Sequence, residues 1–208
     1  MNIKKFPSMG MLAVNSYLAI SDKGNGVLID APEGAVMILN KLKKENVSLK
    51  MILLTHGHFD HIASAAEISR ETGAAVYVHH DDLKKLTNDR LNLTEYFSMP
   101  PTEPVENALT VEDGQVITLD DMDFEVLHTP GHTSGSVCYI LGDNMFCGDT
   151  IFSGSIGRTD MPDGDGKVMR ETLDMLREFD VKTDYRLLPG HGENSSMSVE
   201  RKSNPFLK

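Results

Sequence analysis

Three histidines and one aspartate lie within six residues of this 208-residue chain, at His56, His58, Asp60 and His61. Imidazole nitrogens and carboxylate oxygens are donors that bind zinc and similar ions in proteins. The four side chains directly follow the apolar run 51–54, which is typical of a buried strand, and a helix-like run comes after them. Turns at the carboxyl ends of strands hold binding groups on a rigid scaffold. The cluster therefore predicts a metal site.

Three further metal-competent side chains, His132, Asp149 and His191, lie in turns farther along the chain. Each follows an apolar, strand-like run and stands next to a glycine, which allows close approach of the backbone. A lone histidine is more often a satisfied polar residue than a ligand, but seven such residues in similar turns reverse those odds. Five histidines and two aspartates are too many ligands for one ion and suit two ions that share a bridge. We therefore expect a dinuclear centre.

The spacing divides the first cluster between two ions. The one-residue gap from His56 to His58 allows both imidazoles to reach one ion, while the adjacent Asp60 and His61 turn toward a second. A carboxylate has two oxygens and can neutralise charge between two cations, so Asp149 is the expected bridge. A water between the ions is deprotonated near neutral pH, because one zinc already lowers the pKa of a bound water to roughly 7. Asp60 is the expected catalytic residue, which orients this metal-bridging hydroxide for attack.

The elements that position these turns alternate between strands and helices in the first half of the chain. The predicted strands are 11–20, 26–30, 51–54 and 75–78, and the predicted helices are 32–45 and 62–72. A proline-rich break near 100–104 precedes a half that is rich in short strands. These are predicted at 116–119, 124–127, 136–141, 145–147 and 185–188, with a helix at 167–179. The pattern favours two sheets face to face with helices outside, in one domain of residues 1–208.

The order of the motifs resembles the signature of the metallo-β-lactamase superfamily. The similarity lies in His-x-His-x-Asp-His followed by single His, Asp and His residues, and it covers nearly the whole chain. It implies a four-layer αβ/βα sandwich with two metal ions at one edge. By the family pattern, the first ion is held by His56, His58 and His132. The second ion is held by Asp60, His61 and His191, and the bridge between the two ions is Asp149.

Within that superfamily the chain looks like the short glyoxalase II-like hydrolases, which resemble hydroxyacylglutathione hydrolases. The resemblance rests on the segment 154–160, the Pro-Gly-His-Gly turn and the tail 204–207. It implies that Arg158 meets the carboxylate of the thiol moiety, which suits its planar fork. The alternative is that Arg158 pairs with Asp160 and fixes the loop. Because only seventeen residues follow His191, we expect the C-terminal helical domain that helps bind glutathione to be absent.

Hydrolysis of an anionic thioester is the expected reaction. A thiolate, with a conjugate pKa of about 8.5, departs without a strong general acid, whereas an amine needs one and the sequence shows no clear candidate. Asp149 and His61 argue against the β-lactamases, many of which use a cysteine near Asp149 and lack the equivalent of His61. Two alternatives stay open: a persulfide dioxygenase-like oxidoreductase, which resembles the chain in its ligands but uses one iron, and a lactonase of the same superfamily. Zinc is the expected metal, and iron or manganese would suit the same donors.

Composition argues against several other classes of protein. A net charge of −11 disfavours nucleic-acid and membrane-surface binding. No run approaches the roughly 20 apolar residues that cross a bilayer, and Asn15 and Ser16 interrupt any leader-like segment. With only Cys138 and Cys147 there is no disulfide framework, so a cytoplasmic location is expected. The expected partner is a small molecule, and the oligomeric state is not readable from the sequence.

Other reactive side chains carry weaker predictions. His79 and His80 follow a strand and are expected at a helix start. His128 is a candidate outer partner for a ligating imidazole. Cys147 shares strand parity with Asp149 and could face the site, although a small buried apolar role is the favoured interpretation.

Overall fold

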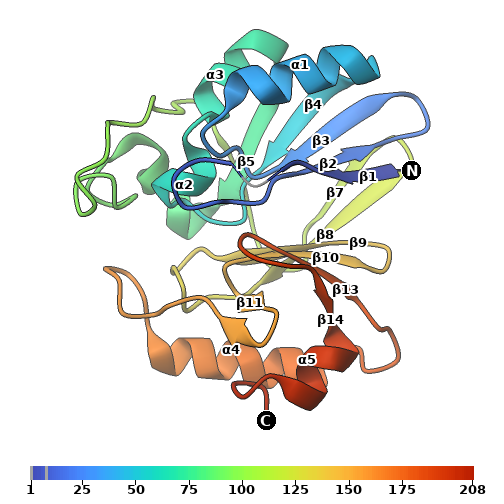
Figure 1. Cartoon of the computed structure of the whole chain (residues 1–208), viewed down its shortest axis with the longest axis vertical. Coiled ribbons are helices and arrows are strands. Elements are labelled where there is room, and N and C mark those ends of the chain that lie inside the picture. The colour runs from blue at the N-terminus through green and yellow to red at the C-terminus, as the bar shows by residue number, and fades with distance from the viewer. Residues whose placement is uncertain (1, 8) are drawn as a thin grey trace.

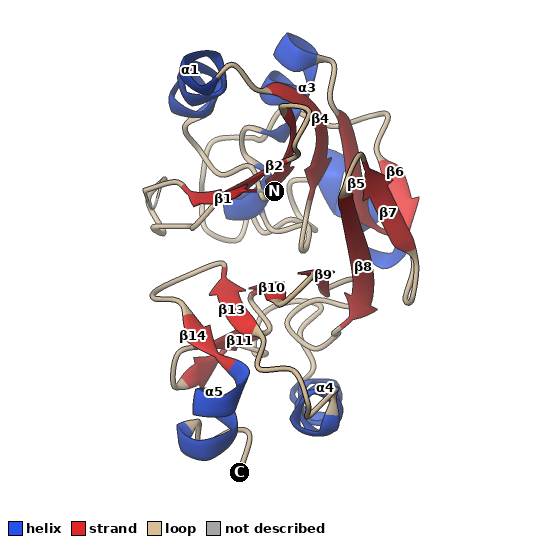
Figure 2. Ribbon diagram, turned by 90° about the vertical axis from the view of Figure 1, so that its right-hand side faces the viewer, coloured by secondary structure: helices blue, strands red, loops and turns tan. Residues whose placement is uncertain are grey.

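The computed structural model describes residues 2–7 and 9–208 and contains two six-stranded β-sheets that pack face to face (Figure 1). The strand order is β1-β2-β3-β4-β5-β6 in the first sheet and β14-β13-β10-β9-β8-β7 in the second, while β11 and β12 form a small separate sheet. Helices α1 and α3 lie on one outer side of the sandwich, and α4 and α5 lie on the other (Figure 2). The predicted four-layer αβ/βα sandwich is therefore confirmed.

The first sheet and its helices come from the N-terminal half. Its strands are β1 (Asn2–Lys5), β2 (Tyr17–Ile20), β3 (Asn25–Ile29), β4 (Ser48–Leu53), β5 (Ala75–His79) and β6 (Leu109–Val111). The helices are α1 (Ala35–Glu45), α2 (Phe59–Ile62), α3 (Ala65–Thr72) and the 3-10 helix η1 (His80–Thr87). The four strands from β3 to β6 pair in parallel, so their carboxyl ends meet at one edge.

The second half of the chain forms the other sheet. Its strands are β7 (Val116–Leu119), β8 (Met122–His128), β9 (Val137–Leu141), β10 (Asn144–Gly148), β13 (Arg186–Pro189) and β14 (Ser195–Ser196). The small sheet consists of β11 (Ile151–Phe152) and β12 (Ser155–Ile156), and the helices are α4 (Gly166–Glu178) and α5 (Met197–Ser203). β7 to β10 form an antiparallel meander, and β13 pairs with β10 in parallel.

Apolar side chains hold the layers together. Between the sheets, Ile29 of the first packs with Phe124 and Phe146 of the second in one buried cluster. Separate clusters join each sheet to its own helices. The buried Tyr17 hydroxyl donates to the carbonyl of Pro189 at 2.9 Å and so satisfies a polar group inside the sandwich. The strand ends that carry the metal-competent residues are therefore held on a rigid core.

Local sequence sets where several helices begin and end. Asp165 caps α4, because its carboxylate accepts hydrogen bonds from the backbone N–H groups of Lys167 and Val168 at 2.8 and 3.1 Å. α1 and α3 end at Asn46 and Gly73, which have left-handed backbone angles that stop a helix. No described helix combines the length and the apolar character that crossing a membrane requires.

The structure differs from the sequence prediction at the first strand. The apolar pattern predicts one strand over 11–20, whereas β2 begins at Tyr17. Residues 9–14 form a tight loop instead, in which Met9 and Val14 exchange backbone hydrogen bonds of 2.9 and 2.8 Å and Ala13 has a positive φ of 55°. The sequence also misses β1, β6, β11, β12, β14 and α5, because elements this short show too few residues to reveal a period.

Candidate metal centre

Four connections that follow strands converge at one edge of the sandwich. They carry all seven residues that the sequence singles out: His56, His58, Asp60 and His61 after β4, His132 after β8, Asp149 after β10 and His191 after β13. Their donor atoms form overlapping groups in which all atoms lie within 4.8 Å of one another. The fold thus brings together side chains that are up to 135 residues apart in the sequence.

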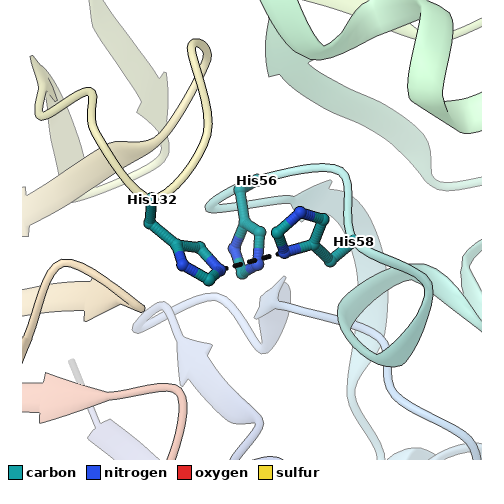
Figure 3. Close-up of side chains that lie close together, drawn as sticks. All are labelled: His56, His58 and His132. Atoms are coloured by element: carbon teal, nitrogen blue, oxygen red, sulfur yellow. Dashed lines mark hydrogen bonds between the residues drawn. The ribbon is translucent and has the colours of Figure 1, made fainter. Parts of the chain in front are cut away.

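Three imidazoles form the first group, and their rings converge from two turns, one that carries His56 and His58 and one that carries His132 (Figure 3). His58 Nδ1 lies 2.9 Å from His132 Nε2, and the ring of His56 stands nearly perpendicular to both at centroid distances of 4.8 Å. All three side chains are buried, and His56 Nε2 and His58 Nε2 have no hydrogen-bond partner among the described residues. Buried polar atoms without partners are costly, so this convergence fits a bound cation.

Asp60, His61 and His191 form the second group. His191 Nε2 lies 3.4 Å from His61 Nε2 and 3.5 Å from Asp60 Oδ2, and His61 Nε2 lies 3.8 Å from the same Asp60 oxygen. Donor atoms of a tetrahedral zinc site with bonds of about 2.0–2.1 Å lie roughly 3.3–3.4 Å apart. The spacing of this group is close to that of the corners of one coordination sphere.

Asp149 contacts donors of both groups. Its Oδ2 lies 3.5 Å from Nε2 of His132 and 3.5 Å from Nε2 of His191, and its Oδ1 lies 3.4 Å from Nε2 of His61. Oδ1 is buried and has no hydrogen-bond partner among the described residues. This is the placement that a carboxylate bridging two ions requires, so the donor set fits two metal ions.

Backbone carbonyls orient two of the candidate ligands. His132 Nδ1 lies 2.7 Å from the carbonyl oxygen of Arg158, and His191 Nδ1 lies 3.0 Å from that of Leu12. A carbonyl can only accept a hydrogen bond, so in each ring Nδ1 donates and Nε2 keeps its lone pair. Outer contacts of this kind fix the tautomer and the orientation of a ligating histidine.

Asp30 performs the same task for two further histidines, and the sequence analysis missed it. The buried Asp30 carboxylate accepts from His61 Nδ1 at 2.9 Å and from the Thr55 hydroxyl at 2.9 Å, and that hydroxyl lies 3.1 Å from His56 Nδ1. Nε2 of both rings is thereby left for the centre. The available signal was positional, because Asp30 follows β3, the parallel neighbour of β4, and so lies at the same sheet edge.

Asp82 is a second residue that sequence reasoning missed. It lies in η1, is fully buried, and accepts hydrogen bonds from the Gly57 and Gly135 N–H groups at 2.7 and 3.0 Å and from the Thr133 hydroxyl at 2.9 Å. Its other strong contact is Lys85 Nζ at 2.5 Å. One carboxylate therefore joins the turn that holds the first two candidate histidines to the turn that holds the third.

Two histidines of the first group, His56 and His58, are held uncharged. Burial, followed by the adjacent His132, lowers the pKa of His58 to about 3. Burial also lowers the pKa of His56 well below its ordinary value, and the neighbouring His61 adds to the effect. Neutral imidazoles have the free lone pair that a metal ligand needs.

The second group is electrostatically different because it contains carboxylates. Burial disfavours the charged form of His61, but Asp30, Asp60 and Asp149 outweigh burial and raise the pKa of His61 well above its ordinary value. Burial by itself would raise the pKa of Asp60, yet His61 and then His191 hold it below its usual range. Both aspartates of the centre are thus carboxylates at neutral pH, since the pKa of Asp149 is lowered by the same histidines despite its burial.

Close packing around Asp149 explains one of the glycines beside the candidate ligands. A Cβ atom at Gly190 would lie 2.5 Å from Asp149 Oδ1 and 2.6 Å from His61 Cε1. Real Cβ atoms do not approach other atoms that closely, so a side chain at this position would displace two of the seven donors.

A cleft of about 360 Å³ opens over the two groups, and Arg158 lines it. The guanidinium forms a bidentate pair with Asp160 through two contacts of 2.8 Å, and its side chain is 57% exposed. This hydrogen-bonded pair lowers the pKa of Asp160 to about 2. The internal pairing expected as the alternative role of Arg158 is therefore present, and the same side chain also borders the cleft.

The weaker candidates lie outside the centre. His128 stacks on His79 at a centroid distance of 4.2 Å, and its Nε2 contacts the carbonyl of Ser134 at 2.8 Å, so its described contacts do not reach a candidate ligand. Cys147 is buried in the apolar cluster beneath α4, where its Sγ lies 3.3 Å from the carbonyl of Ile151. Burial raises the pKa of this thiol well above its ordinary value, as expected for a small apolar role.

Comparison with known proteins gives consistent matches over most or all of the chain. A family model described as the metallo-beta-lactamase superfamily matches residues 9–191. Hydroxyacylglutathione hydrolase GloC of Haemophilus influenzae is 30% identical over 210 residues, with 100% of this chain and 98% of that protein covered. Two solved structures are similar: BLEG-1 B3 metallo-beta-lactamase, with a TM-score of 0.89, 30% identity and both chains fully covered, and TTHA1623 in a di-iron-bound form, with 0.85, 32% and coverage of 97% and 100%.

Proposed function

We propose that this chain, which belongs to the metallo-β-lactamase superfamily, is a dinuclear metallohydrolase that cleaves thioesters of small anionic thiols. The observation that carries the proposal is the position of Asp149, whose two oxygens lie 3.4–3.5 Å from donors of both histidine groups. The similarity to the GloC hydrolase supports the choice of thioesters.

The proposed ligands are the seven residues of the two groups. His56, His58 and His132 would hold one ion, Asp60, His61 and His191 would hold the other, and Asp149 would bridge them. Metal ions bound there would acidify a water molecule and polarise the substrate carbonyl. Nitrogen and oxygen donors suit zinc, and iron and manganese suit them too.

Asp60 has the properties of the residue that orients the attacking water. Its carboxylate belongs to the second group and also lines the open cleft, so it faces the space in which a substrate carbonyl would lie. Because its pKa is held below the usual range, it accepts hydrogen bonds at neutral pH. It can therefore align a water molecule toward the carbonyl carbon.

The cleft suits a leaving group that needs no protonation. Apart from the candidate metal donors, the polar side chains among the described residues of its lining are Ser155 and Arg158. Neither is an acid that could protonate an amine near neutral pH, whereas a thiolate departs unaided because its conjugate pKa is about 8.5. This difference favours thioesters over amides.

Arg158 is the proposed contact for the anionic part of the thiol. Its present partner, Asp160, is 70% exposed, and exposed ion pairs are worth only about 0–1 kcal/mol. A substrate carboxylate can therefore take the place of Asp160 at small cost, with the same bidentate geometry.

Elemental analysis combined with a thioester panel tests this function. We expect about two metal ions per chain and turnover of anionic thioesters in the loaded protein. Asp149→Asn should lose one ion and lower kcat by more than the roughly 10–100-fold that is typical for an outer partner. Full metal loading without thioester turnover would overturn the proposal.

Two competing activities can be measured on the same sample. A single iron per chain with oxygen uptake on a persulfide would indicate the oxidoreductase alternative, and the di-iron form of the similar TTHA1623 makes iron worth testing. Because the similar BLEG-1 is described as a B3 metallo-beta-lactamase, a chromogenic cephalosporin belongs in the panel. If the protein hydrolysed the lactam faster than the thioesters, lactam hydrolysis would become the better supported function.

A further inference from the structure

An apolar cavity of about 310 Å³ lies beside the candidate metal centre. One part of its lining is the loop of residues 9–14, which contributes Met9, Met11 and Leu12, and another part is the segment 99–102, which contributes Met99. The volume is within the lower range of small-molecule sites in proteins. The proposed hydrolysis gives this cavity no role.

The cavity adjoins the cleft over the metal donors. Leu12, Phe59 and Asp60 line both spaces, so the two meet along these three side chains. A substrate whose carbonyl lies beside Asp60 has one end that can enter the apolar cavity. Its other end remains in the main cleft, where Arg158 lies.

Charge assigns the two ends of a thioester to the two spaces. Apart from the candidate ligand Asp60, which lines both spaces, the charged side chain among the described residues around the apolar cavity is the acidic Glu33, so the cavity disfavours an anion. Apart from the candidate metal ligands, the charged side chain among the described residues that line the main cleft is the cationic Arg158. The anionic thiol therefore fits the Arg158 side, and the uncharged acyl group fits the apolar side.

Both parts of the lining are anchored to the segments that carry the candidate ligands. On one side, the carbonyl of Leu12 accepts from His191 at 3.0 Å. On the other, the buried Asn92 accepts from the Phe59 N–H at 2.9 Å and donates to Thr102 at 3.0 Å. The backbone of the cavity is thus fixed relative to the metal donors, while the methionine side chains that line it can adapt to different occupants.

We infer that this cavity binds the acyl chain of the substrate, so that the substrate is the thioester of an apolar carboxylic acid. The inference rests on the proposed thioester hydrolysis and narrows its substrate class. At about 30 Å³ for each water-sized group, the cavity holds roughly ten such groups, which corresponds to a chain of medium length. Met11, 75% exposed in the free protein, would be covered by the bound chain.

A series of thioesters with one thiol and different acyl groups tests the inference. We would measure kcat/KM of the metal-loaded enzyme for esters of 3-mercaptopropionate from acetyl to dodecanoyl. The value is expected to rise about two- to fourfold for each added methylene until the cavity is filled, as expected for burial of apolar surface. Rates that are flat or fall with chain length, while acetyl thioester is still hydrolysed, would overturn the inference and leave the proposed function intact. Absence of turnover at every length would instead refute the proposed function and the inference with it.

Binding measurements give a readout that does not depend on turnover. In 2-oxoalkyl thioethers of the same thiol a methylene separates carbonyl from sulfur, so they cannot be hydrolysed. The 2-oxononyl compound should bind at least about tenfold more tightly than the 2-oxopropyl compound by calorimetry. Equal dissociation constants would contradict an acyl site.

Variants locate the effect in the cavity. Met11→Ala and Leu12→Ala shorten apolar side chains and keep the backbone carbonyl that contacts His191, and each should lower the octanoyl-to-acetyl ratio of kcat/KM about three- to tenfold. Met37→Ala removes a methionine of α1 that is 43% exposed and lines neither space, and this variant should keep the ratio. The competing possibility is that a second copy of this chain occupies the cavity. Sedimentation of the same variants tests it by measuring their association state. A change in association state with no change in the ratio would refute the acyl site.

Discussion

Asp30 Oδ2 lies 2.9 Å from Nδ1 of His61, and both side chains are buried. The same carboxylate accepts from Thr55, which in turn contacts His56. A residue that is not itself a candidate ligand therefore orients one imidazole in each of the two donor groups.

Replacing Asp30 should weaken metal binding without removing a ligand. Asp30→Asn keeps the shape of the side chain but loses the charge that supports Nδ1–H of His61, so the metal affinity should fall about 10–100-fold. Competition with a chromogenic chelator measures this affinity. Asp174→Asn, an exposed aspartate of α4, is the matched control and should bind metal normally. An unchanged affinity in Asp30→Asn would show that the ligand rings are oriented without this contact.

Asp82 should matter mainly for stability. Its carboxylate is fully buried and its partner Lys85 is 6% exposed, so Asp82→Asn leaves a buried ammonium group with reduced compensation. Removal of one partner of a buried pair costs about 3–5 kcal/mol, and the free energy of unfolding in urea should fall by that amount.

Asp163→Asn provides the comparison for Asp82. Asp163 contacts the same ammonium group at 2.7 Å but is 38% exposed, so water replaces much of the lost interaction. Its loss of stability should therefore be clearly smaller. Equal losses in the two variants would contradict the central role of Asp82.

The metal-free protein should lose stability in acid because of His58. The folded-state pKa of His58 is about 3, below the usual unfolded value of about 6.5, so the unfolded chain binds the proton more readily between these values. Stability is therefore present above pH 6.5 and falls as the pH drops toward 3, with a slope of up to about 1.4 kcal/mol per pH unit for this one group.

Unfolding in urea at several pH values between 4 and 6.5 measures that slope. The variant His58→Gln has no titrating group at this position. The slope of its unfolding free energy against pH should therefore be smaller by up to about 1.4 kcal/mol per pH unit, the contribution of one proton. Parallel pH profiles for the two proteins would show that His58 is not the group responsible.

Arg158 should affect the binding of anionic substrates. Arg158→Ala removes a contact that is worth about 0.5–1 kcal/mol at an exposed side chain, so KM for thioesters of carboxylate-bearing thiols should rise about two- to fivefold, with little change for neutral thiols. Arg70→Ala is the control, because Arg70 is similarly exposed and pairs with Glu103 away from the cleft. Equal KM changes for neutral and anionic substrates would favour a purely structural role.

The sequence marks the candidate ligands of the centre but not the residues that orient them, and the reason is physical. His132, Asp149 and His191 each follow an apolar strand and adjoin a glycine, so the sequence marks them. Asp30 and Asp82 read as ordinary polar residues at a strand end and a helix start, because their roles depend on pairing between distant segments.

The loop of residues 9–14 shows why an apolar pattern can mislead. Met11 and Leu12 resemble part of a buried strand, yet they are 75% and 44% exposed and line the cavity beside the metal donors. Apolar residues that line a cavity produce the same sequence pattern as apolar residues that pack in the core. The sequence alone does not separate the two cases.

The candidate ligands are divided between the two sheets, and this division has a mechanical consequence. His56 and His61 follow a strand of the first sheet, whereas His132 and Asp149 follow strands of the second. An ion bound by both sets of ligands would link the two sheets, so its binding free energy would add to the stability of their packing. Removal of such an ion would therefore weaken the packing of one sheet on the other.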